Sequence, residues 1–543
     1  MMNRSVNRCG LLLAQVLVIS TCWISISRPV SGADYFLTIG GGYDRSGNQA
    51  SLEANVVFFQ QVLAERHRGP LRHDIYFADG HDPAADLQIL AEKPAKDQAP
   101  SKTPATDLLA SVHRRNGQVN VTYRNHQVTG ISGPLDPALI RADLDKLAKT
   151  AQAGDRLIVY VTAHGSEGEE NDPFNTTIDC WNERKITARE FTGWLNKLPS
   201  KVPVVMVMAQ CYCGGFANTI FQDLDQDKGL APHLRVGFFA QQHDLPAAGC
   251  RPDIEHDEEF SSYFWGALAG RSRNGVPIKD CDVDGNGSVS FAEAYAYAVT
   301  AGETVDIPLR TSEVALRAFS RLKAAESKDA AGTKENKTAE QNESAQDTKA
   351  VPAGHEISKE RPALSTMSGT LQSFVDRGRP VSGRIVIQLS KTLGFQLQDD
   401  VKVVTAAYDG LRRGGRGRGR RQGSGRRDLI KEITEKWPEL GDARKWEKSP
   451  LLKLDNQEKL LAELKQLPSW KSFEERLKQR ENASQESEKR ELREVKFRRL
   501  INALETIVLE KNLPQFATPE IVARYQQILA LEESFLSPGE RRN

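Results

Sequence analysis

The sequence predicts an α/β protein: a mostly parallel sheet flanked by helices, followed by a disordered linker and an all-α C-terminal region. Three observations lead to this fold class. Short apolar runs at residues 157–162, 204–209 and 236–240 have the composition of strands that are buried on both faces. Segments with helical periodicity separate these runs, and this alternation is typical of a parallel sheet covered on both sides. After residue 319 the composition becomes polar and then helical.

Residues 34–320 are predicted to form the α/β domain. An apolar strand at residues 35–39 leads through a glycine-rich turn into a helix near residues 50–65, and a second strand follows at residues 74–77. Residues 137–151 place their leucines and isoleucine on one face of a helix. Further helices are expected between the three apolar runs, near residues 187–198 and 215–224.

Residues 1–33 have the features of a secretory signal peptide. Arg4 and Arg8 precede a largely apolar stretch at residues 11–26, and the small residues at 31–33 offer a cleavage site. We therefore expect an exported protein, either periplasmic, cell-surface or secreted. An uncleaved anchor is the alternative because the apolar stretch is long. No later segment reaches the ~20 apolar residues that a membrane span needs, so none is predicted after signal removal.

The remaining sequence divides into four segments. Residues 321–373 are rich in Lys, Glu, Ala, Ser and Thr and lack large aromatic side chains, which predicts a disordered linker. A helical segment is expected at residues 374–410, and a helical region that could bind a protein partner at residues 428–537. Between them, residues 411–427 form an Arg-Gly-rich linker. Because this linker has no aromatic residue on which bases could stack, the sequence argues against nucleic-acid binding.

Charge and cysteine content exclude several classes of protein. The 543 residues include 73 Lys and Arg and 72 Asp and Glu, a net charge of +1, so the whole chain is neither a basic nucleic-acid binder nor an acidic solvating chain. Seven cysteines are too few for a disulfide scaffold. Signal removal leaves an odd number, so at least one thiol stays outside any intramolecular bridge. The cysteines that remain are Cys180, Cys211, Cys213, Cys250 and Cys281.

Two chemically reactive residues follow the two central strands. His164 and Gly165 come directly after the apolar run at residues 157–163, and Cys211 follows the run at residues 204–209. The carboxyl ends of neighbouring parallel strands face one crevice, so the imidazole and the thiol are expected to meet there. A histidine can activate a thiol as a thiolate, and a glycine leaves its backbone N–H open to an oxyanion. Taken singly, each residue is more often plain packing.

This pair of motifs resembles the legumain/caspase-like clan of cysteine peptidases. In that clan a strand that ends in a histidine is followed about 50 residues later by a strand that leads into the nucleophilic cysteine, as the run before Gln210 and Cys211 does here. The resemblance covers about half the chain and implies a caspase-like sheet. It also implies a cysteine endopeptidase that acts on a peptide or protein substrate, with His164 as acid and base, Cys211 as nucleophile, and the backbone N–H groups of Gly165 and Cys211 at the oxyanion.

The resemblance leaves specificity and one alternative nucleophile open. Ala209 occupies the place of an acid in legumains, so specificity for Asn or Asp is not carried over. Asp253 and Asp257 belong to an acidic run that could line a pocket for Lys or Arg side chains, although a solvated loop is the simpler interpretation. Cys213 is a second nearby thiol, and Cys211 is preferred because it follows the strand where the clan has its nucleophile.

Residues 282–293 match the twelve-residue calcium loop of EF-hand proteins. The segment before the loop lacks helical character, so we expect a half site that holds a structural Ca²⁺ rather than a sensor. A metal-free turn is the alternative. The expected ligands are Asp282, Asp284, Asn286, the Ser288 carbonyl, Ser290 directly or through water, and Glu293.

Together these features predict an exported cysteine endopeptidase with a bound structural calcium ion. Two alternatives have the same fold. The first is a catalytically inactive, caspase-like scaffold that binds calcium, and the second is a surface adaptor that acts through its helical tail.

Overall fold

The computed structural model describes residues 32–90, 105, 108–109, 112, 121–248, 259–322, 364–413, 425–441, 446 and 449–537. Nearly all of the predicted signal peptide, most of the predicted linker, and both Asp253 and Asp257 lie outside these residues. Within the described part of the chain, no helix combines the length and the apolar composition required to cross a membrane.

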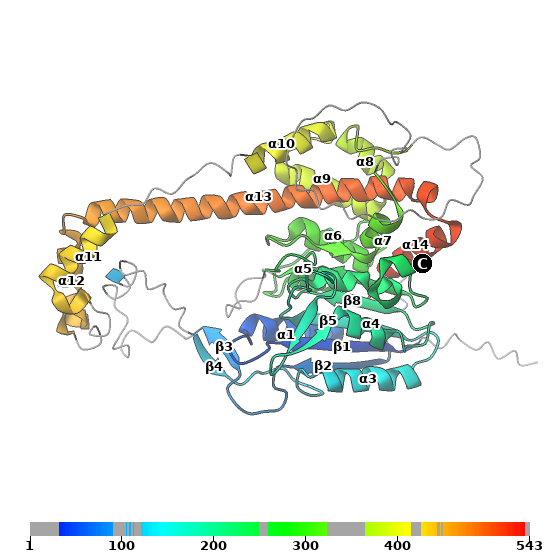
Figure 1. Cartoon of the computed structure of the whole chain (residues 1–543), viewed down its shortest axis with the longest axis horizontal. Coiled ribbons are helices and arrows are strands. Elements are labelled where there is room, and N and C mark those ends of the chain that lie inside the picture. The colour runs from blue at the N-terminus through cyan, green and yellow to red at the C-terminus, as the bar shows by residue number, and fades with distance from the viewer. Residues whose placement is uncertain are drawn as a thin grey trace, which may run out of the picture.

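A six-stranded sheet with the order β10-β9-β8-β5-β1-β2 forms the centre of the molecule (Figure 1). All neighbouring strands are parallel except β10, which pairs antiparallel with β9. The predicted mostly parallel sheet is therefore confirmed, and the apolar runs are buried along β5, β8 and β9. The strands are β1 (Asp34–Gly41), β2 (Leu71–Phe77), β5 (Arg156–Ala163), β8 (Val204–Met208), β9 (Arg235–Phe239) and β10 (Leu309–Arg310).

Helices cover both faces of the sheet. Helix α1 joins β1 to β2 in one direction, whereas the connections through α3 and α4 run in the opposite direction, and right-handed crossovers place these two groups on opposite faces. The Tyr160 ring of β5 packs against Phe59 of α1 and Trp265 of α5, so α5 shares the face of α1. The helices are α1 (Ala50–Arg66), α3 (Pro137–Thr150), α4 (Ala188–Leu195), α5 (Phe260–Ala269) and α6 (Phe291–Ala301).

The predicted helix near residues 215–224 is not an α-helix. The chain forms the 3-10 helix η1 (Cys213–Ile220), then the short turns η2 (Gln222–Leu224) and η3 (Gln226–Lys228). Gly214 and Gly215 open this segment, and a Cβ on either would come within 2.7 Å of neighbouring atoms. Two glycines in the first turn disfavour an α-helix, and the close packing they permit fixes the tighter form.

Two antiparallel hairpins extend from the sheet. One pairs β3 (Leu87–Leu90) with β4 (Val121–Arg124), and the other pairs β6 (Thr177–Cys180) with β7 (Arg184–Thr187). The second hairpin lies against the end of β5. Asp179 N–H of this hairpin donates a hydrogen bond to the His164 carbonyl oxygen at 2.9 Å.

The predicted helical C-terminal region is confirmed, but its boundaries differ from the prediction. Residues 364–373, assigned above to the disordered linker, are ordered because Ser365 N–H donates to Asn512 Oδ1 at 2.8 Å and Leu371 is buried. Helix α10 enters the predicted Arg-Gly-rich linker, and α11 begins within it. The helices are α7 (Thr311–Phe319), α8 (Leu371–Arg377), α9 (Pro380–Leu393), α10 (Val401–Arg413), α11 (Gly425–Lys436), α12 (Gln457–Lys465), α13 (Trp470–Phe516) and α14 (Pro519–Glu532).

Helix α13 is 47 residues long and joins two hydrophobic cores. Its second half packs on α7 and α9 and belongs to the same core as the sheet, whereas its first turns lie in a smaller core with α11 and α12 (Figure 1). That smaller core also contains Ala105, Leu109 and Val112 from the segment between β3 and β4. It includes the short 3-10 turns η4 (Pro438–Gly441), η6 (Pro450–Leu452) and η7 (Leu454–Asn456).

Buried polar contacts attach the C-terminal region to the sheet. Arg310 Nη1 lies 3.2 Å from Glu532 Oε2, and both side chains are almost completely buried. Arg499 of α13 donates hydrogen bonds to four main-chain carbonyls at the end of α6 and in the loop that follows it. Arg156, paired with Asp34 at the start of β1, donates to the carbonyls of Phe535 and Leu536. The helical region is thus part of one body with the α/β domain.

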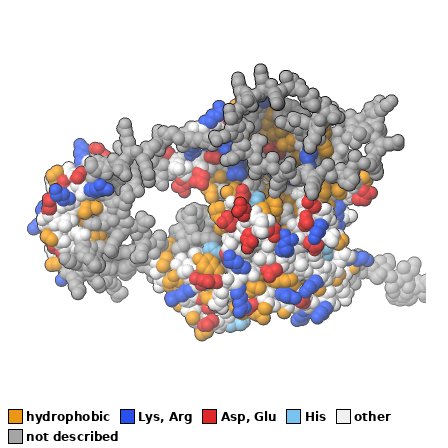
Figure 2. All heavy atoms as spheres, viewed as in Figure 1, with side chains coloured by type: hydrophobic (Ala, Val, Ile, Leu, Met, Phe, Trp, Pro, Cys, Tyr) orange, Lys and Arg blue, Asp and Glu red, His pale blue; other side chains and the backbone are white. Residues whose placement is uncertain are grey.

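The surface charges are mixed. Over the described residues on the face shown in Figure 2, basic and acidic side chains are interspersed rather than gathered into broad areas of one sign. This distribution agrees with the net charge of +1.

Candidate functional site

The ends of β5 and β8 come together at the carboxyl edge of the sheet. Val161 of β5 is paired with Met208 of β8, and His164 and Cys211 each lie three residues beyond this pair. A Cβ on Gly165 would lie 2.3 Å from the Cys211 carbonyl oxygen. Only glycine allows two main chains to approach so closely. The structure therefore brings the histidine segment and the cysteine segment into direct main-chain contact.

The His164 imidazole is held by the turn that follows β1. Its Nε2 lies 2.7 Å from the Gly47 carbonyl oxygen and 3.0 Å from Gln49 Oε1, and the Tyr43 ring packs edge-on at 5.1 Å. A carbonyl can only accept, so Nε2 carries the hydrogen and Nδ1 carries the lone pair when the ring is neutral. Among the described residues, Nδ1 has no hydrogen-bond partner. Burial lowers the pKa of His164, while the Gly47 carbonyl and Asp179 partly oppose this shift.

Cys211 lies on a strained turn immediately after β8. Its side chain is half-buried, and Ala247 N–H donates to Sγ at 3.3 Å. The next residue, Tyr212, has φ +59°, a left-handed conformation that non-glycine residues seldom adopt. Such strain persists only where the surrounding contacts enforce it, and it is concentrated at functional sites. The sharp turn comes from Tyr212 and not from the glycines that follow it.

The other described cysteines are sealed in the core. Cys180, Cys213 and Cys281 are buried, and burial raises the pKa of each thiol, that of Cys281 to about 12. The Cys213 thiol donates to the Gln241 carbonyl at 3.5 Å and accepts from the Gln241 N–H at 3.3 Å. The four described cysteines form no disulfide. Cys211 is the least buried among them.

A buried polar network that the sequence did not indicate lies between α1 and the end of β5. Asn55 of α1 donates hydrogen bonds to Thr162 Oγ1 at 3.1 Å and to Glu259, and accepts one from Arg273 at 2.6 Å. Burial raises the pKa of Glu259 to about 8, and Arg273 partly offsets this shift. Glu259 is the last residue of the acidic run that contains Asp253 and Asp257. Its position in that run was the only available signal, because Asn55 looks like an ordinary helix residue.

The loop at residues 282–293 has the fold of an oxygen-lined turn. Asp282 Oδ1 and Oδ2 accept hydrogen bonds from the N–H groups of Asn286 and Gly287 at 3.1 and 2.7 Å. Asn286 Oδ1 accepts from Ser288 N–H at 3.0 Å. One carboxylate oxygen from each of Asp282, Asp284 and Glu293 lies within 4.8 Å of the others. These three expected ligands are therefore gathered in one place.

Ser290 and Glu293 have a second role, as the N-terminal cap of α6. Glu293 N–H donates to Ser290 Oγ at 3.3 Å and Ser290 N–H donates to Glu293 Oε2 at 2.8 Å, which forms a capping box, and Ser290 Oγ also donates to Glu293 Oε2. Glu293 Oε1 accepts from Val283 N–H at 2.6 Å. The Ser290 hydroxyl is thus engaged by the helix cap. Glu293 could bind a metal through both oxygens only if this capping box opened.

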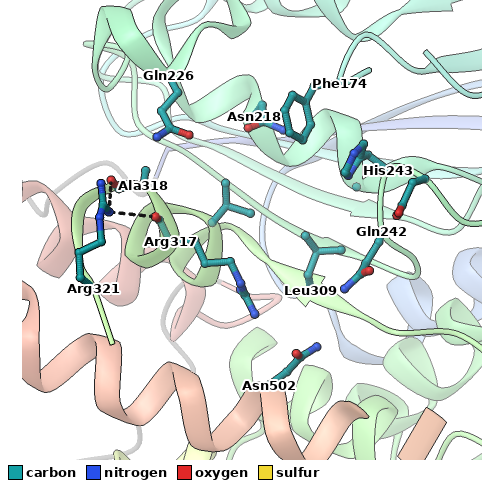
Figure 3. Close-up of a pocket in the computed structure, with 13 residues that line it drawn as sticks. Phe174, Asn218, Gln226, Gln242, His243, Leu309, Arg317, Ala318, Arg321 and Asn502 are labelled. Carbon is teal, nitrogen blue, oxygen red and sulfur yellow. Dashed lines mark hydrogen bonds between the residues drawn. The ribbon is translucent and has the colours of Figure 1, made fainter. Parts of the chain in front are cut away.

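A cavity of about 460 Å³ borders the segment that follows Cys211 (Figure 3). Phe174 and His243 pack at one end with ring centroids 4.4 Å apart and planes tilted by 41°, and Asn502 of α13 lies at the opposite side. Arg317 and Arg321 are the basic residues of the lining, and Asp244 is its acidic residue. The cavity lies between the sheet domain and α13.

No protein-family model matches this sequence, and no curated protein matches it. Among solved structures, the chain is similar to the crystal structure of a Geobacter sulfurreducens protein determined as a structural genomics target. The two share 12% sequence identity, the match covers 48% of this chain and 88% of that one, and the TM-score is 0.27. A likeness this distant carries no information on function.

Proposed function

We propose that this protein is a caspase/legumain-like cysteine endopeptidase, with Cys211 as nucleophile and His164 as acid and base. The observation that carries the proposal is the approach of the two strand ends. Gly165 lies against the Cys211 main chain, and both residues follow paired positions of β5 and β8. This arrangement supports a histidine and a thiol that share one crevice.

The reaction would be acyl transfer to sulfur. With Nε2 held as a donor to the Gly47 carbonyl, Nδ1 of His164 is the base that takes the thiol proton. The thiolate of Cys211 then adds to the peptide carbonyl, and the amine leaves with the proton from His164. Water hydrolyses the resulting thioester. Among the described residues the Gly165 N–H makes no main-chain hydrogen bond, so it is available to the oxyanion.

The environment of the two candidate thiols favours Cys211 over Cys213. Both thiols make the same pair of main-chain contacts, Cys211 with Ala247 and Cys213 with Gln241, so burial is what distinguishes them. Burial raises the pKa of the Cys213 thiol. A thiol must ionise and reach its substrate in order to react. Cys211 is more exposed and lies on the strained turn, which suits a nucleophile.

We also propose that the loop at residues 282–293 holds Ca²⁺. The support for this proposal is that one oxygen from each of Asp282, Asp284 and Glu293 lies within 4.8 Å of the others, and that Asn286 and the Ser288 carbonyl belong to the same turn. The ion would neutralise these carboxylates and fasten the loop to α6. Export, as proposed from residues 1–33, would expose the loop to extracellular calcium.

A thiol-directed probe tests the endopeptidase proposal. Folded full-length protein with calcium is expected to be labelled at Cys211 and to cleave a peptide library. Cys211→Ala should abolish both without lowering the melting temperature, while the matched control Cys213→Ala should retain cleavage. No labelling and no cleavage in the folded wild type would favour the inactive scaffold. Activity that survives Cys211→Ala but not Cys213→Ala would reassign the nucleophile.

A further inference from the structure

A second cluster of potential metal ligands lies away from the site described above. Asp79 follows β2, Asp86 precedes β3 and His126 follows β4, and one ligand atom from each lies within 4.8 Å of the others. The side chains of Asp79 and His126 are 8% and 6% exposed, and Asp86 is 2% exposed. The pairing of β3 with β4 brings Asp86 and His126 together, since Leu87 is opposite Arg124.

The cluster places two buried carboxylates, those of Asp79 and Asp86, beside one imidazole. Arg124, which interacts with Asp86 through its charge, is already paired with Glu53. Two carboxylates that share a buried site cannot both ionise unless a proton or a cation lies between them. The site therefore favours a positive ion.

Two atoms of the cluster lack the partners that buried polar groups need. Asp79 Oδ1 and His126 Nδ1 make no hydrogen bond within the described part of the chain. Asp79 Oδ1 lies 3.9 Å from His126 Nε2, which is too far for a hydrogen bond. A tetrahedral ion with bonds of ~2.0–2.2 Å to nitrogen and oxygen holds two ligand atoms about 3.4 Å apart. The two side chains would therefore have to approach each other by roughly 0.5 Å to share one ion.

We propose that Asp79, Asp86 and His126 bind a divalent transition-metal ion, with Zn²⁺ as its representative. The imidazole ligand separates this site from the loop at residues 282–293, because Ca²⁺ takes oxygen ligands whereas imidazole suits zinc. The Gly80 carbonyl oxygen lies 2.8 Å from His126 Nε2 and can serve as a further ligand. Coordination through Nε2 requires the ring proton to move from Nε2 to Nδ1, so the imidazole stays neutral.

Asp86 also connects this metal site with the turn that holds His164. Asn48 Nδ2 donates to Asp86 Oδ2 at 2.9 Å, and Asn48 Oδ1 accepts from Gly42 N–H at 3.1 Å. The neighbouring Gly47 carbonyl is the acceptor for the His164 ring. The ion would therefore stabilise this turn. Metal binding itself does not depend on the proposed peptidase function.

Zinc titration of the full-length protein tests the proposal. Uptake is measured by competition with a chromophoric chelator in calcium-saturated buffer and in a Cys211→Ala background, so that neither the calcium loop nor that thiol takes the zinc. We expect one equivalent to bind. Asp79→Asn and His126→Gln should each weaken binding at least tenfold. The exposed His81, two residues from Asp79, provides the control, and His81→Gln should bind as the parent does.

The melting temperature of each variant distinguishes the loss of a metal ligand from misfolding of the protein. Asp79→Asn removes a buried charge and should leave the metal-free melting temperature equal or higher. The proposal is overturned if the parent takes up no zinc, or if Asp79→Asn and His126→Gln both bind zinc as tightly as His81→Gln. Neither result bears on peptide cleavage, so this proposal and the proposed peptidase function can fail separately.

Discussion

The ability of His164 to act as a base depends on which ring nitrogen each neighbouring group contacts. Gly47 and Gln49 hold Nε2, and burial lowers the pKa of the imidazole below its ordinary value of 6.5. The ring is therefore neutral, and able to accept a proton at Nδ1, down to a lower pH than a solvated histidine. The charge of Asp179 opposes the shift, so Asp179 limits how far the pKa falls.

The pH profile of peptide cleavage should reflect this environment. We expect the acidic limb of kcat/KM that belongs to His164 to lie below pH 6.5. Asp179→Asn removes a charge that raises the pKa, so it should move this limb to still lower pH. Profiles of kcat/KM against pH for both proteins check the prediction, and a limb above pH 7 that does not move would contradict it.

His73 links the core of the sheet to acid stability. Its Nε2 lies 2.8 Å from Thr38 Oγ1, and burial lowers its pKa to about 4. Below about pH 6.5 His73 therefore binds a proton in the unfolded chain but not in the folded protein. The free energy of unfolding consequently falls as the pH drops from 6.5 to 4. His73→Gln should remove up to about 3 kcal/mol of this loss. Denaturant unfolding at pH 7 and pH 4.5 measures it, with His81→Gln expected to behave as the wild type.

At this scale the sequence was sufficient to locate His164 and Cys211 but not their partners. Both residues end apolar strands, and a parallel sheet delivers strand ends to one edge. The partners of these side chains lie on distant loops and act through main-chain or amide groups, as Gly47, Gln49 and Ala247 do. Many residue types could make such contacts, so the sequence does not reveal them. The cluster of Asp79, Asp86 and His126 was missed for the same reason, since a hairpin assembles it.

The loop at residues 282–293, proposed above to hold Ca²⁺, and α6 act as one element because Glu293 belongs to both. Glutamine can replace glutamate in a capping box, so Glu293→Gln removes the charge and preserves the helix cap. We expect calcium affinity to fall by about tenfold or more, because ligand charge tunes these loops. The rise in melting temperature on adding calcium measures this, and the exposed Glu170→Gln is the control. A calcium response that is equal in all three proteins would remove the metal proposal.

Helices and strands could be predicted where the apolar periodicity was continuous. The prediction was wrong where tertiary packing determined the type of element. The buried runs of β5, β8 and β9 and the periodic helix α3 follow directly from their residues. Most of segment 213–220 lies in a predicted helix, yet its residues other than Ala217 are weak helix formers, and Gly214 and Gly215 pack against main-chain atoms where a 3-10 helix forms. The sequence does not record which main chain will lie beside a glycine.

The whole molecule depends on the contacts of α13 with the sheet domain. Arg499 is 3% exposed, and its guanidinium satisfies the carbonyls of Val299, Gly302, Thr304 and Asp306. Arg499→Met would leave these carbonyls buried without donors and should cost about 3 kcal/mol of unfolding free energy. The neighbouring Arg498→Met, at a partly exposed position, should cost less than about 1 kcal/mol. Equal effects in urea unfolding would show that docking does not depend on Arg499.

The packing of the C-terminal helices against the α/β domain could not be predicted from composition. The polar segment after residue 320 suggested a separate tail, because composition reports local solubility and not distant contacts. Leu371 and Ser365 are ordered by α13, and Glu532 neutralises Arg310 across the same junction. These pairs join residues more than a hundred positions apart, which no local pattern encodes.

The hydrogen bonds from Arg156 to the carbonyls of Phe535 and Leu536 join positions 379 and 380 apart in the sequence. Arg156 is the first residue of β5, which lies inside the sheet, so the sheet and the segment after α14 share one buried guanidinium. A protein cut back to residues 34–320 would keep the pair of Asp34 and Arg156 but lose both carbonyl acceptors, which would leave buried donors unsatisfied. The α/β half should therefore be less stable by itself than in the whole chain.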